Sequence, residues 1–363
     1  KPKSLRLWTI LGKISTHYSV PWRRNRLHSL ASQRFETFWS QVAPSYSGQK
    51  VAIIGSDRPQ NFNCLQNKDL CHFISNVKDT LREAKSLGFV ISTILQHYYD
   101  IIILELTKSK ETNLGLIALA EEYIKDKGKV IINGDNQIGV KSFLNNISNH
   151  WPAEKIMIKK KGRIAIYPKK KQIFSHWKKY QDFHKNRDGY YTRCDMFSPK
   201  EIDKGSKKLT SAFNAKLFGE VADLGAGWGY LSKEALRLND KITKITLFES
   251  NYSAYLASKK NIDDERAKFR WASLYNIKNL KARFNHVICN PPFHSGRPKD
   301  MGLLRSFIFY SSRLITHQGS VWMVFVSGVY LENELRNYFD NIKILYKDNH
   351  YFVCQLLKPK IKR

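Results

Sequence analysis

Short hydrophobic runs alternate with amphipathic stretches along most of the chain. In the first half, the runs that predict buried strands lie at residues 51–55, 89–93, 100–106 and 129–134, and those that predict helices lie at 70–86 and 113–126. Strands that alternate with helices are typical of βαβ units, which build a parallel sheet. The first half is therefore expected to be an α/β domain.

The same alternation restarts near residue 210. The predicted strands are 221–224, 244–248, 269–272, 287–289 and 321–326, and the predicted helices are 229–238, 252–261, 302–317 and 331–339. The last two hydrophobic runs, 342–346 and 351–356, are joined by four polar residues, which predicts a hairpin. At least one strand of the second sheet should therefore be antiparallel.

The two halves correspond strand by strand, which indicates a diverged repeat. Residues 51–55 match 221–225, residues 100–106 match 286–291, and residues 129–133 match 320–325. The first copy lacks the loops described below, because its first strand offers one glycine before Ser56-Asp57-Arg58-Pro59. We therefore expect a tandem α/β protein in which the second copy carries the chemistry.

The amino-acid composition indicates which kind of molecule the protein binds. The 363 residues, enough for two domains, include 61 Lys and Arg against 31 Asp and Glu, a net charge of +30. This excess points to nucleic acid first and to an acidic membrane second, and no apolar run is long enough to span a bilayer. The five cysteines are widely spaced without a CxxC pair, so we expect reduced thiols in a cytosolic-type compartment and no metal site.

Two segments concentrate the positive charge. The first 35 residues hold eight Lys or Arg and no acid, which fits a transit peptide or, as we favour, a basic arm that contacts nucleic acid. Residues 155–193 hold 13 Lys or Arg and two acids, with aromatic residues between them. We place the domain junction there and expect RNA contacts through phosphates and base stacking, the alternative being a solvated linker.

A glycine-rich turn, Asp223-x-Gly225-x-Gly227-x-Gly229, follows the first predicted strand of the second half and opens a helix. Glycines let a backbone approach a ligand closely. The spacing differs from the G-x-G-x-x-G dinucleotide pattern, and Asp223 suits a cationic ligand better than a diphosphate. Glu249 ends the next strand, where a carboxylate can accept both hydroxyls of a ribose, although a helix-capping role is the alternative. Together these residues predict a nucleoside site.

A third signal, Asn290-Pro291-Pro292-Phe293, ends the predicted fourth strand. The prolines stop the sheet and stiffen the backbone. The Asn290 side-chain oxygen and the Pro291 carbonyl can each accept one N–H of a planar amine, and Phe293 offers a face for base stacking. A turn that merely ends a strand requires neither the asparagine nor the aromatic residue.

These motifs resemble the class I S-adenosylmethionine-dependent amino-methyltransferases. The run Asn-Pro-Pro-Phe-His-Ser-Gly at 290–296 and the segment 203–206 are similar to bacterial ribosomal RNA guanine-N2 methyltransferases of the RsmC/RlmG type. The resemblance implies two tandem Rossmann-like domains, each a mostly parallel seven-stranded sheet with an antiparallel C-terminal hairpin strand, the N-terminal copy being degenerate. It departs at Ser273, where many relatives have an acid near the adenine, and at Asn285, where many have Asp.

The resemblance also implies site residues and domain bounds. Catalysis is assigned to Asn290, Pro291 and Phe293, and S-adenosylmethionine binding to Asp223, Gly225, Gly227, Glu249, Ser273, Asn290 and Ser206. The expected domains are a basic extension at 1–45, a degenerate domain at 46–170 for RNA binding or support, a basic linker and cofactor-covering segment at 171–209, and a catalytic domain at 210–363.

The function that the resemblance implies is methylation of the N2 amine of a guanine in ribosomal RNA, with the small-subunit 16S rRNA favoured. The expected enzyme is a cytoplasmic monomer that acts on ribosomal RNA or a ribosomal subunit, without a membrane. In the mechanism, the target base leaves its stack, and His294 either relays a proton or, as we favour, is structural. An adenine-N6 or protein-glutamine amino-methyltransferase is the nearest alternative, and an inactive RNA-binding protein is the alternative from a different class.

Overall fold

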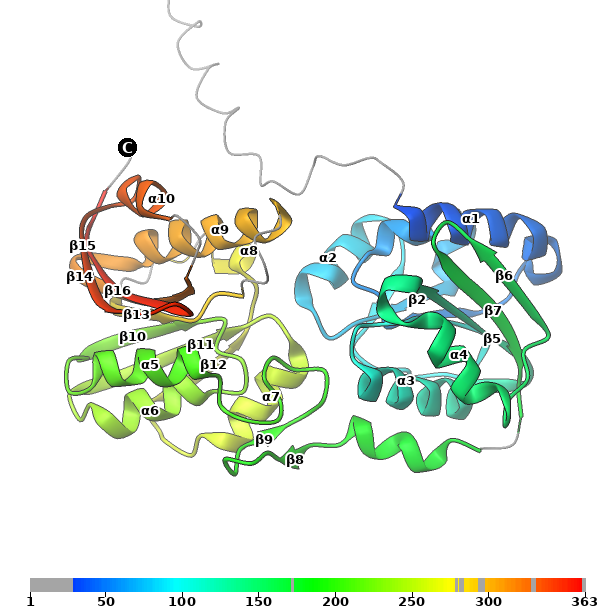
Figure 1. The fold of residues 1–363 in the computed structure, drawn as a ribbon, viewed down its shortest axis with the longest axis horizontal. Helices are drawn as coiled ribbons and strands as arrows, with labels where there is room; N and C mark the ends of the chain where they lie inside the picture. Colours follow the sequence, from blue (N-terminus) through cyan, green and yellow to red (C-terminus); the bar gives the residue numbers. More distant parts are fainter. Residues whose placement is uncertain are drawn as a thin grey trace, which may run out of the picture.

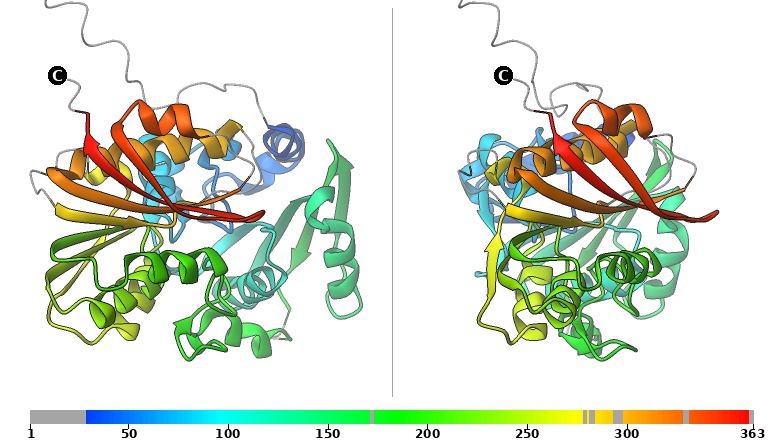
Figure 2. Two further views of the ribbon diagram at one scale, coloured as in Figure 1. Left: turned by 60° about the vertical axis from the view of Figure 1, so that its left-hand side comes forward. Right: turned by 90° about the vertical axis from the view of Figure 1, so that its left-hand side faces the viewer.

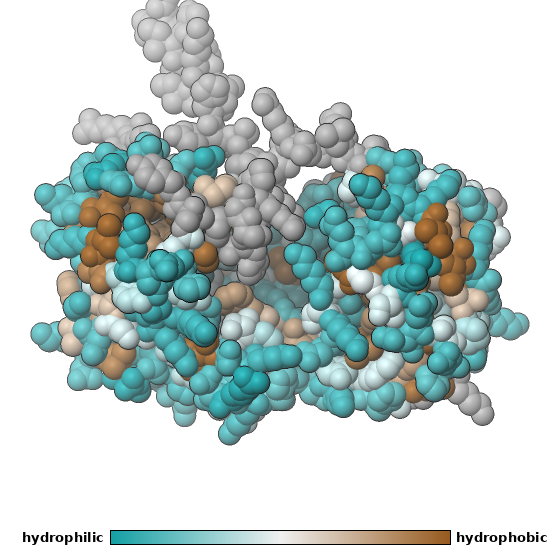
Figure 3. Space-filling model, viewed as in Figure 1, coloured by the Kyte–Doolittle hydropathy of each residue, from teal (hydrophilic) through white to brown (hydrophobic). Residues whose placement is uncertain are grey.

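The computed structural model describes residues 29–170, 173–277, 280, 284–292, 298–327 and 331–360. They form two α/β domains that lie side by side, with the first domain on the right and the second on the left of Figure 1. No helix of the described residues is long and apolar enough to cross a bilayer. The face seen in Figure 3 is largely hydrophilic over both domains, with scattered hydrophobic patches.

The first domain is built on a seven-stranded sheet in the order β3-β2-β1-β4-β5-β7-β6. All neighbours are parallel except β7, which is antiparallel to both β5 and β6. Helices α1 and α2 cover one face, and α3 and α4 cover the other. The bounds are β1 (Val51–Ile54), β2 (Cys71–Ile74), β3 (Val90–Ser92), β4 (Tyr99–Glu105), β5 (Ile124–Asp135), β6 (Lys155–Lys159), β7 (Gly162–Pro168), α1 (Leu30–Val42), α2 (Lys78–Ser86), α3 (Lys110–Tyr123) and α4 (Val140–Ser148).

The second domain repeats this topology in the order β12-β11-β10-β13-β14-β16-β15, and only the pairs that β16 makes are antiparallel. Helices α5, α6 and α7 cover one face, and α8, α9 and α10 cover the other (Figures 1 and 2). The bounds are β10 (Gly219–Leu224), β11 (Ile242–Glu249), β12 (Ala267–Trp271), β13 (Phe284–Cys289), β14 (Ile315–Val326), β15 (Phe339–Lys347), β16 (Tyr351–Pro359), α5 (Lys204–Phe213), α6 (Tyr230–Leu238), α7 (Tyr252–Asn261), α8 (Leu274–Ile277), α9 (Pro298–Leu314) and α10 (Glu332–Arg336).

The predicted fold class is confirmed: the chain holds two tandem Rossmann-like domains of identical strand order. The pairing of neighbouring strands also shows which single residues of the two domains correspond. In the first domain Ile53 pairs with Ile103, and in the second Asp223 pairs with Ile288. Counting two residues onward from each pair, Gly55 corresponds to Gly225 and Glu105 corresponds to Asn290.

Two expectations from the sequence differ from the structure. The stretch 70–86, predicted as one helix, is strand β2 followed by helix α2, because Cys71, His72 and Phe73 are buried on both faces of the sheet. The extension predicted at 1–45 includes α1, whose Phe35 and Phe38 are fully buried against the first sheet. Residues 1–28, the most basic part of that extension, lie outside the described residues.

The basic stretch 155–193, where we placed the domain junction, divides between the two domains, and its first part lies within the predicted bounds 46–170. Strands β6 and β7 complete the first sheet, so residues 155–168 belong to the first domain. Beyond them, Phe174 is buried in the first domain's core and stacks on Trp177 at 4.3 Å between ring centroids, while Tyr190 is buried against the second domain. Tyr167, Phe174 and Tyr190 are therefore structural residues rather than exposed platforms for RNA bases.

The first domain docks on the second through the start of α2 (Figure 1). The Lys78 amide donates to the Ser250 carbonyl at 3.0 Å, and its ammonium donates to the Trp271 carbonyl at 2.7 Å. In return, the Tyr252 amide donates to the Asn76 carbonyl at 2.7 Å, and Arg82 lies 3.9 Å from the centroid of the Tyr275 ring. These contacts lie where β11 passes into α7 and where β12 passes into α8.

Candidate active site

The glycine-rich turn joins β10 to α6 at the carboxyl edge of the second sheet. Gly225, Gly227 and Gly229 all have positive φ, between 56° and 93°, which favours glycine over residues with a side chain. A Cβ on Gly227 would meet nothing within 4 Å, whereas one on Gly229 would lie 3.0 Å from Ile262 and 3.1 Å from Ser258. Gly229 thus permits close packing on α7, and Gly227 leaves open space above the turn.

Asp223 lies behind this turn and is fully buried. Its Oδ2 accepts a hydrogen bond from the Ser232 hydroxyl at 2.7 Å, while its Oδ1 has no hydrogen-bond partner among the described residues. Burial, with a contribution from the nearby Glu249, raises the pKa of Asp223 to about 7. The residue is therefore a buried acid with one free acceptor atom.

Glu249 ends β11 and links the turn to the neighbouring loop. Its Oε2 accepts from the Gly227 amide at 2.8 Å, and its Oε1 accepts from the Asn251 amide at 2.6 Å. Burial raises its pKa above the usual range. The backbone and the side chain of Ser250 also interact with this carboxylate by hydrogen bonding.

Asn290 follows β13 and is held by α5. Its Nδ2 donates to Asp203 Oδ2 at 2.9 Å and to Ser206 Oγ at 2.8 Å. Asp203 is itself the N-cap of α5, because its Oδ2 also accepts from the Ser206 amide at 2.8 Å. An ionised carboxylate only accepts hydrogen bonds, so the amide nitrogen of Asn290 must face Asp203, and its oxygen Oδ1 remains available as an acceptor.

The other predicted residues lie around this edge. Ser273, which follows β12, is buried and donates its hydroxyl hydrogen to Asn276 Oδ1 at 3.1 Å, so its lone pairs are left to accept. Pro291 is buried and lies beyond Cys289, the last residue of β13 that pairs with β14. Phe293 and His294 fall outside the described residues.

Asp203 is the residue whose role the sequence analysis missed. It was noted only as part of a segment similar to relatives. An Asp directly before a helix is an N-cap signal, but no helix was predicted at 204–213, so the cap was missed together with helix α5. Its contact with Asn290, 87 positions away, was not predicted either.

The corresponding edge of the first domain is filled by its own side chains. Glu105, at the position of Asn290, is bonded to the Ser56 hydroxyl and accepts from Asn61 Nδ2 at 3.1 Å. The short 3-10 helix Pro59–Phe62 buries Pro59, Asn61 and Phe62 over the place where the second domain has its open glycine turn. A Cβ on Gly55 would lie 2.3 Å from the Glu105 carbonyl oxygen, so strand and turn are in direct contact there.

Comparison with known proteins identifies the second domain. Residues 190–355 match the family model described as "Methyltransferase small domain". This part of the chain is therefore similar to that family. The match begins in the segment that precedes α5, which the sequence analysis had assigned to a linker.

Curated relatives extend the similarity to the first domain. The ribosomal RNA small subunit methyltransferase C of Buchnera aphidicola (subsp. Schizaphis graminum) is 31% identical over 160 residues, which cover 44% of this chain and 47% of that protein. Its counterpart in Haemophilus influenzae (strain PittEE) is 24% identical over 282 residues, which cover 76% of this chain and 82% of that protein. The family resemblance predicted from the sequence is thus confirmed.

A solved structure shares the arrangement of both domains. The T. thermophilus 16S rRNA N2 G1207 methyltransferase (RsmC), described in complex with AdoMet and guanosine, superposes with a TM-score of 0.74 at 17% identity and covers 93% of this chain and 92% of its own. At this identity the likeness concerns the fold, and it covers both α/β domains of the chain.

Proposed function

We propose that this chain transfers a methyl group from S-adenosylmethionine to the exocyclic N2 amine of a guanine in small-subunit ribosomal RNA. The relatives named as small-subunit rRNA methyltransferases support the substrate, and so does the net charge of +30. The observation that carries the proposal is the Asn290 amide, whose nitrogen is held by Asp203 and Ser206 so that its oxygen is presented as an acceptor.

The residues at this edge fit the cofactor. The open space at Gly227 admits a ligand against the turn, and the Glu249 carboxylate beside it is an acceptor suited to the hydroxyls of a ribose. Ser273 can accept from an adenine amine, and the unpartnered Oδ1 of Asp223 offers an acceptor for a cationic group. When bound, S-adenosylmethionine supplies an electrophilic methyl group on a sulfonium sulfur.

The protein's part in the reaction is to prepare the amine. The N2 lone pair of guanine is delocalised into the ring and is a poor nucleophile. Asn290 Oδ1 and the Pro291 carbonyl accept its two N–H bonds, which draws the nitrogen toward tetrahedral geometry and stabilises the positive charge that develops on it. Because these acceptors are fixed before the substrate arrives, the amine is also positioned for in-line attack. Phe293 is proposed to stack on the base after it leaves the RNA helix.

We also propose that the protein works as a monomer in the cytoplasm, where its ribosomal substrate resides. One chain supplies both domains, and the degenerate domain contacts the loops of the candidate site directly. A molar mass in solution equal to one chain is the expected result from light scattering.

Replacing Asn290 with alanine tests the proposal. Methyl transfer to ribosomal RNA should fall by orders of magnitude, because both roles of the Oδ1 acceptor are lost, while S-adenosylmethionine binding measured by calorimetry should survive. Asn146→Ala, an exposed asparagine on α4, is the matched control and should leave both unchanged. Full activity in Asn290→Ala would remove Asn290 from the mechanism.

A further inference from the structure

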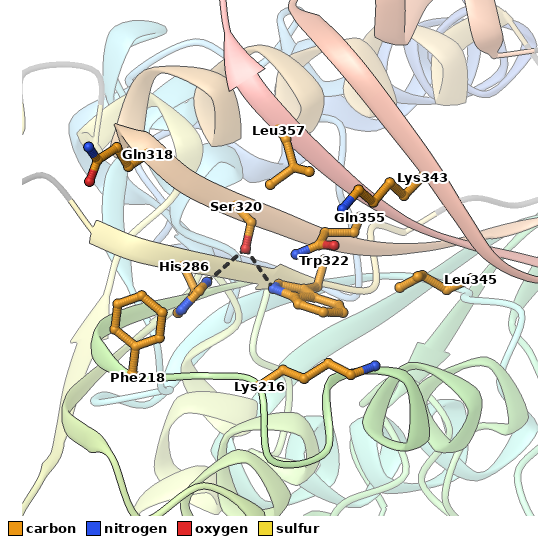
Figure 4. A pocket seen from close by; sticks show the side chains of 10 residues that line it. All are labelled: Lys216, Phe218, His286, Gln318, Ser320, Trp322, Lys343, Leu345, Gln355 and Leu357. Carbon is orange, nitrogen blue, oxygen red and sulfur yellow. Dashed lines mark hydrogen bonds between the residues drawn. The ribbon is translucent and has the colours of Figure 1, made fainter.

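A groove lies at the amino ends of the second sheet's strands, away from the candidate active site. It has a volume of about 410 Å³, within the usual ~300–1,000 Å³ of ligand pockets. Figure 4 shows its floor, formed by His286, Ser320 and Trp322, with Phe218 and Lys216 on one side and Lys343 on the other. Nothing in the proposed methyl transfer uses these residues.

The floor of the groove contains three side chains joined by hydrogen bonds, and the nitrogen at one end of this chain has no partner among the described residues. Trp322 Nε1 donates to Ser320 Oγ at 2.9 Å, and Ser320 Oγ lies 2.7 Å from His286 Nδ1. If the Ser320 hydroxyl donates its hydrogen to Nδ1, then Trp322 Nε1, Ser320 Oγ and His286 Nδ1 each have a hydrogen-bond partner. The hydrogen of the neutral imidazole is then on Nε2. Among the described residues Nε2 has no hydrogen-bond partner, although His286 is only 4% exposed. A buried polar group is ordinarily paired, so this nitrogen points to a missing acceptor.

Burial also keeps the imidazole neutral. The pKa of His286 is lowered to about 4 because the ring is removed from solvent. Near neutral pH the imidazole is therefore neutral, and in the tautomer described above its Nε2 carries the hydrogen and donates. Such a donor suits the oxygen of a phosphate, a ribose or a base carbonyl.

The walls add positive charge and an exposed ring. Lys216 and Lys343 are exposed, and none of the ten described residues that line the groove is acidic. Lys216 donates to the Ala212 carbonyl at 2.7 Å, which leaves two of its three ammonium hydrogens available. Phe218 is 48% exposed and packs nearly perpendicular to the His286 ring, at 4.6 Å between centroids. The exposed Phe218 ring thus lies against the imidazole at the edge of the groove.

Helix α5 connects the groove to the candidate active site. Its N-cap, Asp203, holds Asn290, and the chain that leaves its C-terminus carries Lys216 and Phe218. Ten helical residues span about 15 Å, and the four positions from His286 to Asn290 along β13 span about 13 Å. Residues 286, 288 and 290 alternate onto one face of the sheet, the face that α5 covers. In its first turn α5 also presents the exposed Lys204 and Lys207.

We propose that this groove binds one nucleotide of the RNA strand that flanks the target guanine, with its phosphate between Lys216 and Lys343, its base on Phe218 and an oxygen on His286 Nε2. The assignment rests on the proposed function, because it takes the same RNA as the substrate. It adds a second contact along α5 that is independent of the cofactor. The groove therefore contributes to substrate recognition rather than to chemistry.

Equilibrium binding of RNA to the full chain, without S-adenosylmethionine, tests the groove. The probes are a fluorescent single-stranded RNA long enough to reach from Asn290 to His286 and a short one that reaches only the candidate active site. Phe218→Ala should weaken binding of the long RNA about tenfold and leave the short RNA unaffected. In Lys216→Ala/Lys343→Ala, the slope of log affinity against log salt should decrease by about 0.7, because the contact with one phosphate is lost.

The control pair Lys241→Ala/Lys268→Ala removes two exposed lysines of the same domain outside the groove and should change the slope little. An equal change in both pairs, or an equal loss for the two RNAs in Phe218→Ala, would overturn the proposal. Competition by guanosine monophosphate as effective as that by the long RNA would assign the groove to free nucleotides and overturn it too. Failure of methyl transfer would refute the proposed function without altering these binding results, so the two outcomes are distinguishable.

Discussion

Asp203 is expected to control the rate of methyl transfer through Asn290. Asp203→Ala removes the oxygen that accepts from both Asn290 Nδ2, at 2.9 Å, and the Ser206 amide, at 2.8 Å. Loss of the N-cap should lower the free energy of unfolding by about 0.5–2 kcal/mol. Loss of a hydrogen bond to a charged group costs about 1.5–3 kcal/mol and frees the Asn290 amide to rotate. If that energy is lost in the transition state, kcat should fall roughly 10- to 150-fold.

The conservative variant separates positioning from stability. Asp203→Asn retains an oxygen that caps α5 and accepts from Asn290, so it should recover most of the stability and most of kcat. Single-turnover methyl transfer measures the rate, calorimetry measures the cofactor's Kd, and urea unfolding measures stability. Asp203→Ala should change kcat far more than Kd. A loss of stability with unchanged kcat, or equal losses of kcat in the two variants, would refute the reasoning.

Two further predictions concern the glycine turn and the buried acid behind it. Gly229→Ala should lower the melting temperature more than Gly227→Ala, because both have positive φ but only the Cβ at 229 meets neighbours, at 3.0 and 3.1 Å; equal losses would contradict this. The folded-state pKa of Asp223, about 7, lies above its ordinary 3.8, so the native state binds this proton more tightly and stability from this group is lost as pH rises from about 4 to about 7. The stability of Asp223→Asn relative to the original chain should therefore rise as pH rises from about 4 to about 7 and level off above it, and urea unfolding that shows no such trend would contradict the assignment.

Much of the fold was predictable because its buried strands are hydrophobic runs. The central strands of both sheets, such as β4 and β13, and the closing hairpin of β15 and β16 follow directly from runs bounded by turn residues. Their placement in one parallel sheet brings the ends of β10, β11 and β13 to a common edge. Asp223, Glu249 and Asn290 therefore lie at one edge of the sheet, although they are far apart in sequence.

The failures have physical causes in short segments. Only three residues separate strand β2 (residues 71–74) from helix α2, so the sequence pattern of the strand and the helix together resembled that of one helix. Helix α1 lies in a basic stretch whose charge suggested an extended arm, yet Arg34 is fully buried because Asn133 and Asp135 accept from its guanidinium, each at 2.8 Å. Partners about 100 positions away cannot be found from local composition. Long-range pairing also hides the link between Asp203 and Asn290.

The two copies differ in what fills the edge of the sheet, and this explains how a domain without an open site remains useful to the other. In the first copy the Glu105 carboxylate is hydrogen-bonded to Ser56 and Asn61, and these side chains fill the carboxyl edge of the sheet. The same domain then uses α2 to hold its neighbour: Ser250 accepts from the Lys78 amide at 3.0 Å and from Trp271 Nε1 at 2.9 Å, and Lys78 bonds the Trp271 carbonyl. Ser250 directly follows Glu249, and Trp271 lies two residues before Ser273. The degenerate copy thus fixes the two loops that carry the candidate ribose and adenine contacts, so its contribution to the site is made through the interface rather than through a site of its own.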